Sequence, residues 1–354
     1  MHIHDDRGHV LITGGAGFIG ANLADRLLAD GRRVVVFDNL SRAGVELNAR
    51  WLAERWGDHV TIVRGDTRDR EALRAVMPGA TEVFHFAAQV AVTTSIDDPL
   101  TDFAINGLGT LHVLEEARRC PTPPAVFFTS TNKVYGSLPD VAMTAGSESY
   151  APVDQRLRAA GIDESRQLDF HSPYGCSKGL ADQYLLDYAR TYGLRTVVLR
   201  MSCIYGPRQF GTEDQGWVAH FLISALNGLP LTLYGDGRQV RDVLFVDDLV
   251  DAFLLAGGAI DRTAGRAYNV GGGPANAVSL LGMVEHIEAL TGATLAIDWS
   301  QWRLGDQRWY VSDTSRLRAD TGWRPRTAWR DGVARLHRWL VEGEDARETV
   351  RDAV

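Results

Sequence analysis

A short apolar strand that runs directly into a glycine-rich turn constrains this 354-residue chain more than any other feature. Residues 10–13, Val-Leu-Ile-Thr, have the character of a buried strand, and Gly14, Gly17 and Gly20 follow at once. A helical pattern of leucines then continues to Gly31. Glycines at this spacing let the backbone approach a pyrophosphate and let the helix pack closely on the sheet. The sequence therefore predicts a dinucleotide-binding turn.

The second predicted strand, residues 34–37, indicates which dinucleotide binds. Asp38 follows it about 20 residues after the glycine turn, where a carboxylate accepts hydrogen bonds from the adenosine ribose. That carboxylate repels a 2′-phosphate, so NAD is favoured over NADP, although Arg42 lies nearby in the sequence. The residues expected to contact NAD are Gly14, Gly17, Phe18, Ile19, Gly20, Asp38, Asn39, Asp66, Thr67, Ala87, Ala88, Gln89, Tyr174 and Lys178.

Apolar runs alternate with helical patterns along the first 200 residues. The strand-like runs lie at 60–63, 82–86, 125–129 and 196–200. Such alternation predicts an α/β fold, a Rossmann-like doubly wound parallel sheet with ligands at the strand C-termini, followed by a smaller α/β substrate domain. We expect an NAD-binding domain at 8–200 rejoined by 243–272, a substrate domain at 201–242 and 273–342, and a tail at 343–354.

A tyrosine and a lysine four residues apart are the strongest sign of chemistry. Ser172 is a suitable N-cap for a helix that presents Tyr174 and Lys178 on one face. We expect Tyr174 to take a proton from a sugar hydroxyl as a nicotinamide takes hydride, with Thr131 aligning that hydroxyl. The pKa of Tyr174, near 10 for a free tyrosine, must then fall by about three units, which requires roughly 4 kcal/mol of stabilisation of the phenolate. Lys178 and an oxidised nicotinamide ring are cations that can supply such an effect.

The composition excludes several kinds of partner. The net charge is −8 and no basic tract occurs, so nucleic acid is not expected. The sequence has no run of about 18 apolar residues, and its polar beginning is not typical of a signal peptide. Cys120, Cys176 and Cys203 lack the spacing of a metal site or a disulfide. We therefore expect no metal and a cytoplasmic location.

Arginines in the C-terminal part are candidates for binding an anion. Arg208, Arg241 and Arg303 are far apart in the sequence, but we expect them to converge on a cleft between the two domains. A guanidinium binds phosphate oxygens through two hydrogen bonds, which suits a nucleotide diphosphate. For each arginine taken alone, a solvated surface position is the alternative.

Longer motifs carry a resemblance to a known family. They are Ser-Thr-Asn-Lys-Val-Tyr-Gly (130–136), Leu-Asp-Phe-His-Ser-Pro-Tyr-Gly-Cys-Ser-Lys-Gly (168–179), Gly-Pro-Arg-Gln-Phe-Gly-Thr-Glu-Asp-Gln-Gly-Trp-Val (206–218), Gly-Arg-Gln-Val-Arg-Asp-Val-Leu (237–244) and Gly-Asp-Gln-Arg (305–308). Along nearly its whole length the chain resembles the extended short-chain dehydrogenase/reductase family. Within that family it is most similar to the CDP-paratose 2-epimerases, also called CDP-tyvelose epimerases. It departs from them at Met201, where they carry histidine, and at Gly206-Pro207, which replaces a double glycine.

The resemblance implies a tightly held NAD⁺ that is not consumed, and inversion of C2 in a CDP-linked sugar through a transient 2-keto sugar. A C2–H bond has no adjacent carbonyl to acidify it, so transient oxidation avoids a difficult proton abstraction. In the family, the lysine holds the cofactor ribose, and arginines at positions 241 and 303 hold the nucleotide diphosphate. The residues expected to bind the nucleotide sugar are Thr131, Asn132, Lys133, Ser202, Arg208, Gln209, Arg241 and Arg303.

Several alternative activities share this fold. Sugar-nucleotide 4,6-dehydratases carry Asp-Glu where this chain has Asn132-Lys133, which leaves no acid to protonate a departing hydroxyl. A C4-epimerase of a UDP- or GDP-hexose uses the same Thr/Tyr/Lys set. A net dehydrogenase or reductase would exchange its cofactor at each turnover, and a non-catalytic NAD-binding protein would tend to lose the Tyr/Lys pair.

The resemblance also implies a homodimer or homotetramer. Family members usually pair through the Tyr/Lys helix and the helix before Thr131. That earlier helix includes Leu108, Leu111, Val113 and Leu114, which fit an interface or the core equally well.

Overall fold

The computed structural model describes residues 8–303 and 305–342, and in them a seven-stranded sheet whose neighbouring strands are all parallel. Its order is β12-β8-β5-β4-β1-β2-β3. The strands are β1 (His9–Thr13), β2 (Val34–Asp38), β3 (Val60–Arg64), β4 (Ala80–His85), β5 (Ala125–Thr131), β8 (Thr196–Met201) and β12 (Arg266–Val270). The order reverses between β1 and β4, where doubly wound sheets bind ligands. The predicted fold class is confirmed.

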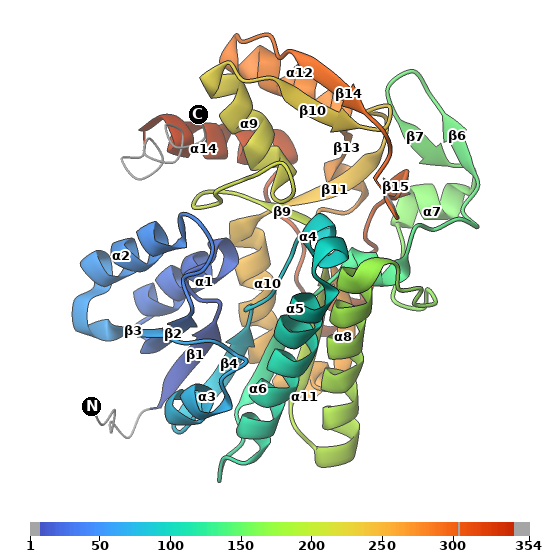
Figure 1. The fold of residues 1–354 in the computed structure, drawn as a ribbon. Helices are drawn as coiled ribbons and strands as arrows, with labels where there is room; N and C mark the ends of the chain where they lie inside the picture. The colour runs from blue at the N-terminus through green and yellow to red at the C-terminus, as the bar shows by residue number, and fades with distance from the viewer. Residues whose placement is uncertain (1–7, 304, 343–354) are drawn as a thin grey trace.

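Helices cover both faces of this sheet (Figure 1). One face packs against α1 (Phe18–Ala29), α2 (Val45–Trp56) and α10 (Val246–Gly258), and the other against α3 (Arg70–Val76), α6 (Gly109–Arg118) and α8 (Ser172–Tyr192). Neighbouring residues of β1 such as Leu11 and Ile12 join different apolar clusters because side chains alternate along a strand. Burial on both faces explains why most strand residues are apolar in sequence.

The helix α8 begins and ends as its sequence predicts. The Ser172 hydroxyl accepts a hydrogen bond from the Gly175 amide at 3.2 Å, which caps the first turn. Pro173 needs no hydrogen-bond acceptor at this position. Gly193 ends the helix in the left-handed conformation, with φ of 69°. These caps fix the turn that carries Tyr174 and Lys178.

A smaller α/β part lies above the C-termini of the large sheet (Figure 1). Its central strand β11 (Val240–Phe245) pairs with β9 (Cys203–Tyr205), β13 (Ala277–Ser279) and β15 (Trp309–Tyr310). A parallel pair, β10 (Leu231–Tyr234) and β14 (Ile297–Ser300), and the helices α9 (Trp217–Asn227), α12 (Leu280–Thr291) and α14 (Trp329–Glu342) complete it around one apolar cluster.

The chain crosses between the two parts more than once. Both α10 and β12 lie within the segment 243–272 that was expected to rejoin the first domain, and β12 pairs with β8 at one edge of the large sheet. The exact division into two domains stays a prediction. The predicted tail, 343–354, lies outside the described residues.

Short elements complete the described fold. They are α4 (Val92–Asp97), α5 (Pro99–Phe103), α7 (Gln155–Ala160), α11 (Ile260–Thr263), α13 (Ser315–Thr321), the hairpin β6 (Met143–Ala145) and β7 (Tyr150–Pro152), and single turns at Gly57–His59, Asn132–Tyr135 and Pro274–Asn276. A π-helical turn, η2 (Ala104–Leu108), joins α5 to α6. Within the described ranges, no helix has both the length and the apolar character needed to cross a membrane.

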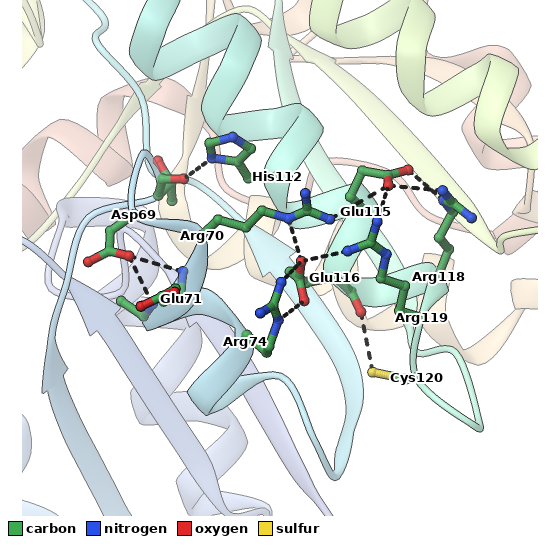
Figure 2. A network of polar contacts seen from close by, with 12 residues as sticks. Asp69, Arg70, Glu71, Arg74, His112, Glu115, Glu116, Arg118, Arg119 and Cys120 are labelled. Atoms are coloured by element: carbon green, nitrogen blue, oxygen red, sulfur yellow. Dashed lines mark hydrogen bonds and ion pairs between the residues drawn. The ribbon is translucent and has the colours of Figure 1, made fainter.

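A cluster of charges links α3 to α6 (Figure 2). Glu116 accepts hydrogen bonds from Arg70 and Arg74 on α3, and Glu115 also accepts one from the Tyr188 hydroxyl of α8 at 2.8 Å. We call this set the α3–α6 ion cluster; its members are Arg70, Arg74, Glu115, Glu116, Arg118 and Arg119. The arginine side chains are about one third to one half exposed, so they remain in contact with solvent.

Candidate active site

Two cavities meet at the carboxyl ends of the central strands. One, of about 360 Å³, extends along the glycine turn and β2, and the other, of about 370 Å³, extends into the smaller α/β part. We call them the dinucleotide cavity and the sugar cavity. They share one wall, which consists of Val90, Thr131, Tyr174, Cys203 and Trp217. Tyr174 and Thr131 therefore face both cavities, as a group that acts between a cofactor and a substrate must.

The glycine turn has the geometry that a pyrophosphate requires. A Cβ atom on Gly14 would lie 2.5 Å from the Ala87 amide nitrogen, and one on Gly20 would lie 2.5 Å from the Gly14 carbonyl oxygen. Side chains at these positions would separate α1 from the sheet. Gly17 is the N-cap of α1 and has no side chain to occupy the first amides, so the helix N-terminus is available to an anion. These residues fit a dinucleotide.

The adenosine end of the same cavity is polar. The two oxygens of Asp38 accept hydrogen bonds from the amides of Ala16, at 3.0 Å, and Leu40, at 2.9 Å. Burial raises the pKa of Asp38 despite these bonds. Each carboxylate oxygen keeps a lone pair for a ribose hydroxyl. Arg42 also lines this cavity.

Asp66 lies beside Asp38 in the dinucleotide cavity, with its carboxylate already engaged by protein donors. Asn39 donates to it at 2.9 Å, and two nitrogens of the Arg68 guanidinium donate at 2.9 and 2.7 Å. Hydrogen bonds from Arg68 lower the pKa of Asp66 against the opposing effect of burial. The carboxylate is thus held ionised and in one orientation.

Thirteen of the fourteen residues expected to contact NAD line the dinucleotide cavity. The exception is Gln89, whose side chain donates to the Ala91 carbonyl at 2.7 Å. Its backbone amide donates to Asn106 at 3.0 Å. Gln89 thereby shapes the loop after β4 and does not contribute to the cavity lining.

Tyr174 and Thr131 form the chemical centre of the shared wall. Thr131 ends β5, Tyr174 begins α8, and their hydroxyls share a hydrogen bond. Burial raises the pKa of Tyr174 to about 12, the Thr131 bond lowers it, and the charge of Asp102 raises it. The direction is opposite to the lowering expected from the sequence, because Tyr174 is only 8% exposed and desolvation outweighs nearby charge.

Lys178 lies one helical turn after Tyr174 and lines the dinucleotide cavity. Its ammonium nitrogen lies 4.1 Å from the centre of the Phe128 ring. Burial lowers the pKa of Lys178 to about 7, while the carboxylates of Asp102 and Asp182 raise it. A lysine that titrates near neutral pH responds to small changes in its surroundings, which is typical of a functional site.

Lys133 and Arg241 face the sugar cavity together. Both pair with Asp306, Lys133 at 3.3 Å and Arg241 at 2.6 Å. Burial raises the pKa of Asp306, but the charges of Arg241 and Lys133 outweigh it and bring the pKa to about 2. Asp306 is therefore ionised, and it fixes two cations at the wall of the cavity.

Arg303 lines the other side of the sugar cavity. Its guanidinium lies 3.9 Å from the centre of the Tyr234 ring and pairs with Asp214 at 3.1 Å. Tyr234 in turn donates its hydroxyl to Glu213. Glu213 and Asp214 both belong to the loop between Gln209 and Trp217. Their contacts with Tyr234 and Arg303 therefore hold that loop against the cavity.

The remaining substrate candidates lie elsewhere. Ser202 and Gln209 line the dinucleotide cavity, not the sugar cavity. The Arg208 guanidinium lies 3.2 Å from the centre of the Trp51 ring on α2, and Arg208 lines neither cavity. Of the three arginines expected to converge, the structure brings Arg241 and Arg303 to one cavity and places Arg208 away from it.

Comparison with known proteins decides the family. The family described as "NAD dependent epimerase/dehydratase family" matches residues 10–271. The chain belongs to this family. Its members depend on NAD, in accord with the dinucleotide cavity, and the chain is thus an enzyme of nucleotide-sugar metabolism.

Members of the epimerase/dehydratase family with different reactions are similar to this chain. It is 43% identical over 339 residues to the CDP-paratose 2-epimerase of Salmonella typhi, covering 93% of this chain and 98% of that protein. It is 36% identical to the UDP-glucose 4-epimerase of Mycolicibacterium smegmatis, covering 92% and 96%. A solved double mutant of the dTDP-glucose 4,6-dehydratase of Streptomyces venezuelae, with NAD bound, superposes with a TM-score of 0.81 at 31% identity, covering 97% and 99%.

Several cavity residues of this epimerase/dehydratase were not singled out from the sequence. Trp217 and Asp306 each lie inside a motif quoted above, so the motifs contained a signal that spacing alone did not resolve. His220 and Tyr234 come from α9 and β10, where they are typical of an amphipathic helix and an alternating strand. Only the fold shows that these side chains turn toward the cavity.

Proposed function

We propose that this chain inverts C2 of a CDP-linked sugar by transient oxidation to a 2-keto sugar, as in the conversion of CDP-paratose to CDP-tyvelose. The observation that carries the proposal is the 43% identity to the Salmonella typhi CDP-paratose 2-epimerase over almost the whole of both chains. The shared wall of Tyr174 and Thr131 supports it, because a hydroxyl held there lies between the two cavities.

Tyr174 is the proposed general base and acid. In its phenolate form, Tyr174 takes the proton of the C2 hydroxyl and becomes the phenol, and Thr131, hydrogen-bonded to the same oxygen, holds the hydroxyl in line. The ammonium of Lys178 stabilises the phenolate charge and binds the cofactor ribose. After the keto sugar has turned its other face, Tyr174 returns the proton to the same oxygen, so the enzyme ends as it began.

The residues along the dinucleotide cavity would hold NAD. The first turn of α1 receives the phosphates, Asp38 the adenosine ribose, and Lys178 the ribose next to the nicotinamide. When bound, NAD supplies the acceptor for the C2 hydride, the positive ring that favours the phenolate, and the donor that returns the hydride. Trp217 and Cys203 line both cavities and would shield the reacting carbon from water.

Elimination of water requires a carboxylic acid beside the sugar, and the lining acids are paired. Asp306 is ionised between Lys133 and Arg241, and Asp214 pairs with Arg303. At the positions that follow Thr131, the side chains are the amide of Asn132 and the ammonium of Lys133. These pairings favour epimerisation over a 4,6-dehydratase reaction, which needs a proton donor for the departing hydroxyl.

The sugar end of the cavity favours a deoxygenated sugar that can turn. Val90, Val92 and Ile96 form an apolar wall on the same cavity as Tyr174. Such side chains accept no hydrogen bond from a sugar hydroxyl, so they suit sugar carbons that bear no hydroxyl group. They also do not hold the sugar ring in one orientation. Arg241 and Arg303 line the same cavity and provide the charge for the diphosphate, so that the nucleotide stays bound while the sugar turns.

Incubation with CDP-paratose, without added NAD, tests the proposal. NMR should show a new C2 epimer, no accumulation of NADH, and no dependence of the rate on external cofactor. A parallel incubation with UDP-glucose serves as the comparison substrate. If CDP-paratose is unchanged while UDP-glucose is inverted at C4, the assigned carbon and nucleotide are wrong although the reaction class stands; stoichiometric NADH would instead indicate a dehydrogenase.

Exposed apolar side chains on α5 and α8 support the proposed homodimer or homotetramer. Val113 and Leu114 of α6 are fully buried in the core of the chain, so they take no part in an interface. Leu100, Phe103 and Tyr192, which lie on α5 and α8, are more than half exposed. We propose that a second copy covers exposed side chains of α5 and α8.

A further inference from the structure

Asp102 is a buried carboxylate near Lys178 that the proposed mechanism does not use. It lies on α5, which packs against α8. The residue is only 1% exposed. Its Oδ1 accepts a hydrogen bond from Asn106 at 3.1 Å, but its Oδ2 has no hydrogen-bond partner among the described residues. Burying a half-satisfied carboxylate costs stability, so its presence requires a reason.

Asn106, in the π-helical turn η2, fixes this carboxylate relative to α8. Its side-chain nitrogen also lies 3.0 Å from the Ser177 hydroxyl oxygen and 3.0 Å from the Gln89 carbonyl oxygen, so its two hydrogens are shared among three acceptors. Ser177 immediately precedes Lys178, and its hydroxyl donates to the Tyr174 carbonyl at 3.2 Å. A single amide therefore ties Asp102 to the turn of α8 that carries both Tyr174 and Lys178.

The other groups around Lys178 have partners of their own. Asp182 accepts two hydrogen bonds from Arg200, at 2.8 and 2.9 Å. His85 on β4 lies between Thr13 and Thr110, at 2.6 and 2.9 Å, and its burial, with the charge of Lys178, lowers its pKa to about 3, so it is neutral. Phe128 contributes only its ring face. Asp182 is thus already paired with Arg200, whereas the charge of Asp102 raises the pKa of Lys178 without a direct bond between the two side chains among the described contacts.

We propose that Asp102 is a positioning residue, whose buried carboxylate and its Asn106–Ser177 contacts hold the Lys178 ammonium charged and in place beside Tyr174. The negative charge of Asp102 favours the protonated form of Lys178, and this effect is the reason for a carboxylate whose burial costs stability. It acts through Lys178 and touches neither substrate nor cofactor.

The directions in which Asp102 shifts the pKa values of Lys178 and Tyr174 predict the effect of removing the Asp102 charge. Burial lowers the pKa of Lys178, and Asp102 opposes this, so an amide at position 102 leaves Lys178 to lose its proton at lower pH. Burial raises the pKa of Tyr174, and Asp102 adds to this, so the same amide lets Tyr174 ionise at lower pH. Both limbs of a bell-shaped pH profile therefore move in the same direction, toward acid.

The test compares wild type with Asp102→Asn, and with Asp187→Asn as the matched control. Asp187 lies on α8 but is half exposed and pairs with Arg190. For Asp102→Asn we expect both limbs of kcat against pH to move about one pH unit toward acid, the size of effect that a close charge has. We also expect an unchanged or higher Tm, because a buried charge is removed. Asp187→Asn should leave the profile in place.

A second readout needs no substrate. Titration of phenolate absorbance in wild type and Asp102→Asn, each minus the same protein with Tyr174→Phe, reports the ionisation of Tyr174 directly. We expect it at lower pH in Asp102→Asn. Because the pH profile is that of the proposed epimerisation, the kinetic arm rests on the proposed function, whereas the titration does not.

A structural role gives a different pattern. If Asp102→Asn and a second variant, Asp102→Ala, lose activity or Tm while the pH limbs and the Tyr174 titration stay in place, Asp102 merely packs α5 on α8 and the proposal is overturned. If the titration moves but CDP-paratose is not converted, Asp102 keeps its role and the substrate is the part that is wrong.

Discussion

Two groups of charges meet the same long helix and behave in opposite ways. The α3–α6 ion cluster touches α8 through Tyr188, and its arginines remain in water. The second group, which we call the Lys178 cluster, consists of Asp102, Lys178, Asp182 and Arg200. All four of its members are buried, with at most 4% exposed.

The pKa directions show what this difference means. In the α3–α6 ion cluster, burial raises the pKa of Glu116, but hydrogen bonds from Arg74 and Arg70 outweigh it, and the pKa falls. In the Lys178 cluster, burial dominates for two members: the pKa of Lys178 falls and that of Asp102 rises. For Arg200, burial lowers the pKa, but the hydrogen bonds and charge of Asp182 outweigh it, and the pKa rises. Glu116, whose arginine partners are solvated, is held ionised, whereas Lys178 and Asp102, which have no such directly bonded ion partner among the described residues, are shifted toward their neutral forms, where they can exchange protons. The first arrangement joins helices, and the second suits catalysis.

Removing the phenol beside the Lys178 cluster should have the largest effect. Tyr174→Phe removes the proposed base, so we expect kcat to fall on the order of 10³-fold, within the range of general acid–base catalysis. Tyr188→Phe, on the same helix, removes only the bond to Glu115 and should keep its activity. Epimer formation followed by NMR measures both. Equal activity of the two variants would exclude Tyr174 as the base.

Breaking the buried ion pair should have the next largest effect, this time on stability. Asp182→Ala leaves the buried guanidinium of Arg200 without its carboxylate, so we expect the free energy of unfolding to fall by about 3–5 kcal/mol. Asp187→Ala breaks an exposed pair on the same helix and should cost less than about 1 kcal/mol. Urea denaturation compares them. Similar losses would mean that burial does not distinguish the two pairs.

The smallest effect should come from the α3–α6 ion cluster. Glu116→Gln removes a carboxylate whose partners are solvated, so we expect a loss of about 1 kcal/mol, smaller at high salt. Because the pKa of Glu116 is lowered in the folded state, its contribution is present above its unfolded pKa and is lost as pH falls through the folded value. Denaturation at several pH values checks this sign. A difference from wild type that persists in acid would contradict it.

Much of this fold follows from local sequence. Each strand of the large sheet that was singled out is mostly apolar, and the glycine turn and the capped Tyr/Lys helix have signatures within a few residues. The dinucleotide cavity was predictable for the same reason, because its residues follow directly from strand ends. Of the residues predicted to contact NAD, only Gln89 does not line this cavity.

The sugar cavity was harder to predict, since its residues converge from distant segments. Arg208 has the composition of an anion ligand, but its ring partner Trp51 comes from a helix more than 150 positions earlier. Asp102 lies in a five-residue helix with no motif to mark it. The pKa of Tyr174 could not be derived from spacing either, because desolvation depends on the whole packed site.

The common wall of the two cavities has a thermodynamic consequence. A side chain such as Trp217 that borders both cavities contributes to two binding constants at once. Suppose that bound dinucleotide strengthens the binding of the nucleotide sugar through that wall. The bound nucleotide sugar then strengthens the binding of the dinucleotide by the same free energy, because coupling between two sites is reciprocal. A substitution at Trp217 that weakens this coupling would be measured as a loss of affinity for both molecules, even though each occupies a cavity of its own.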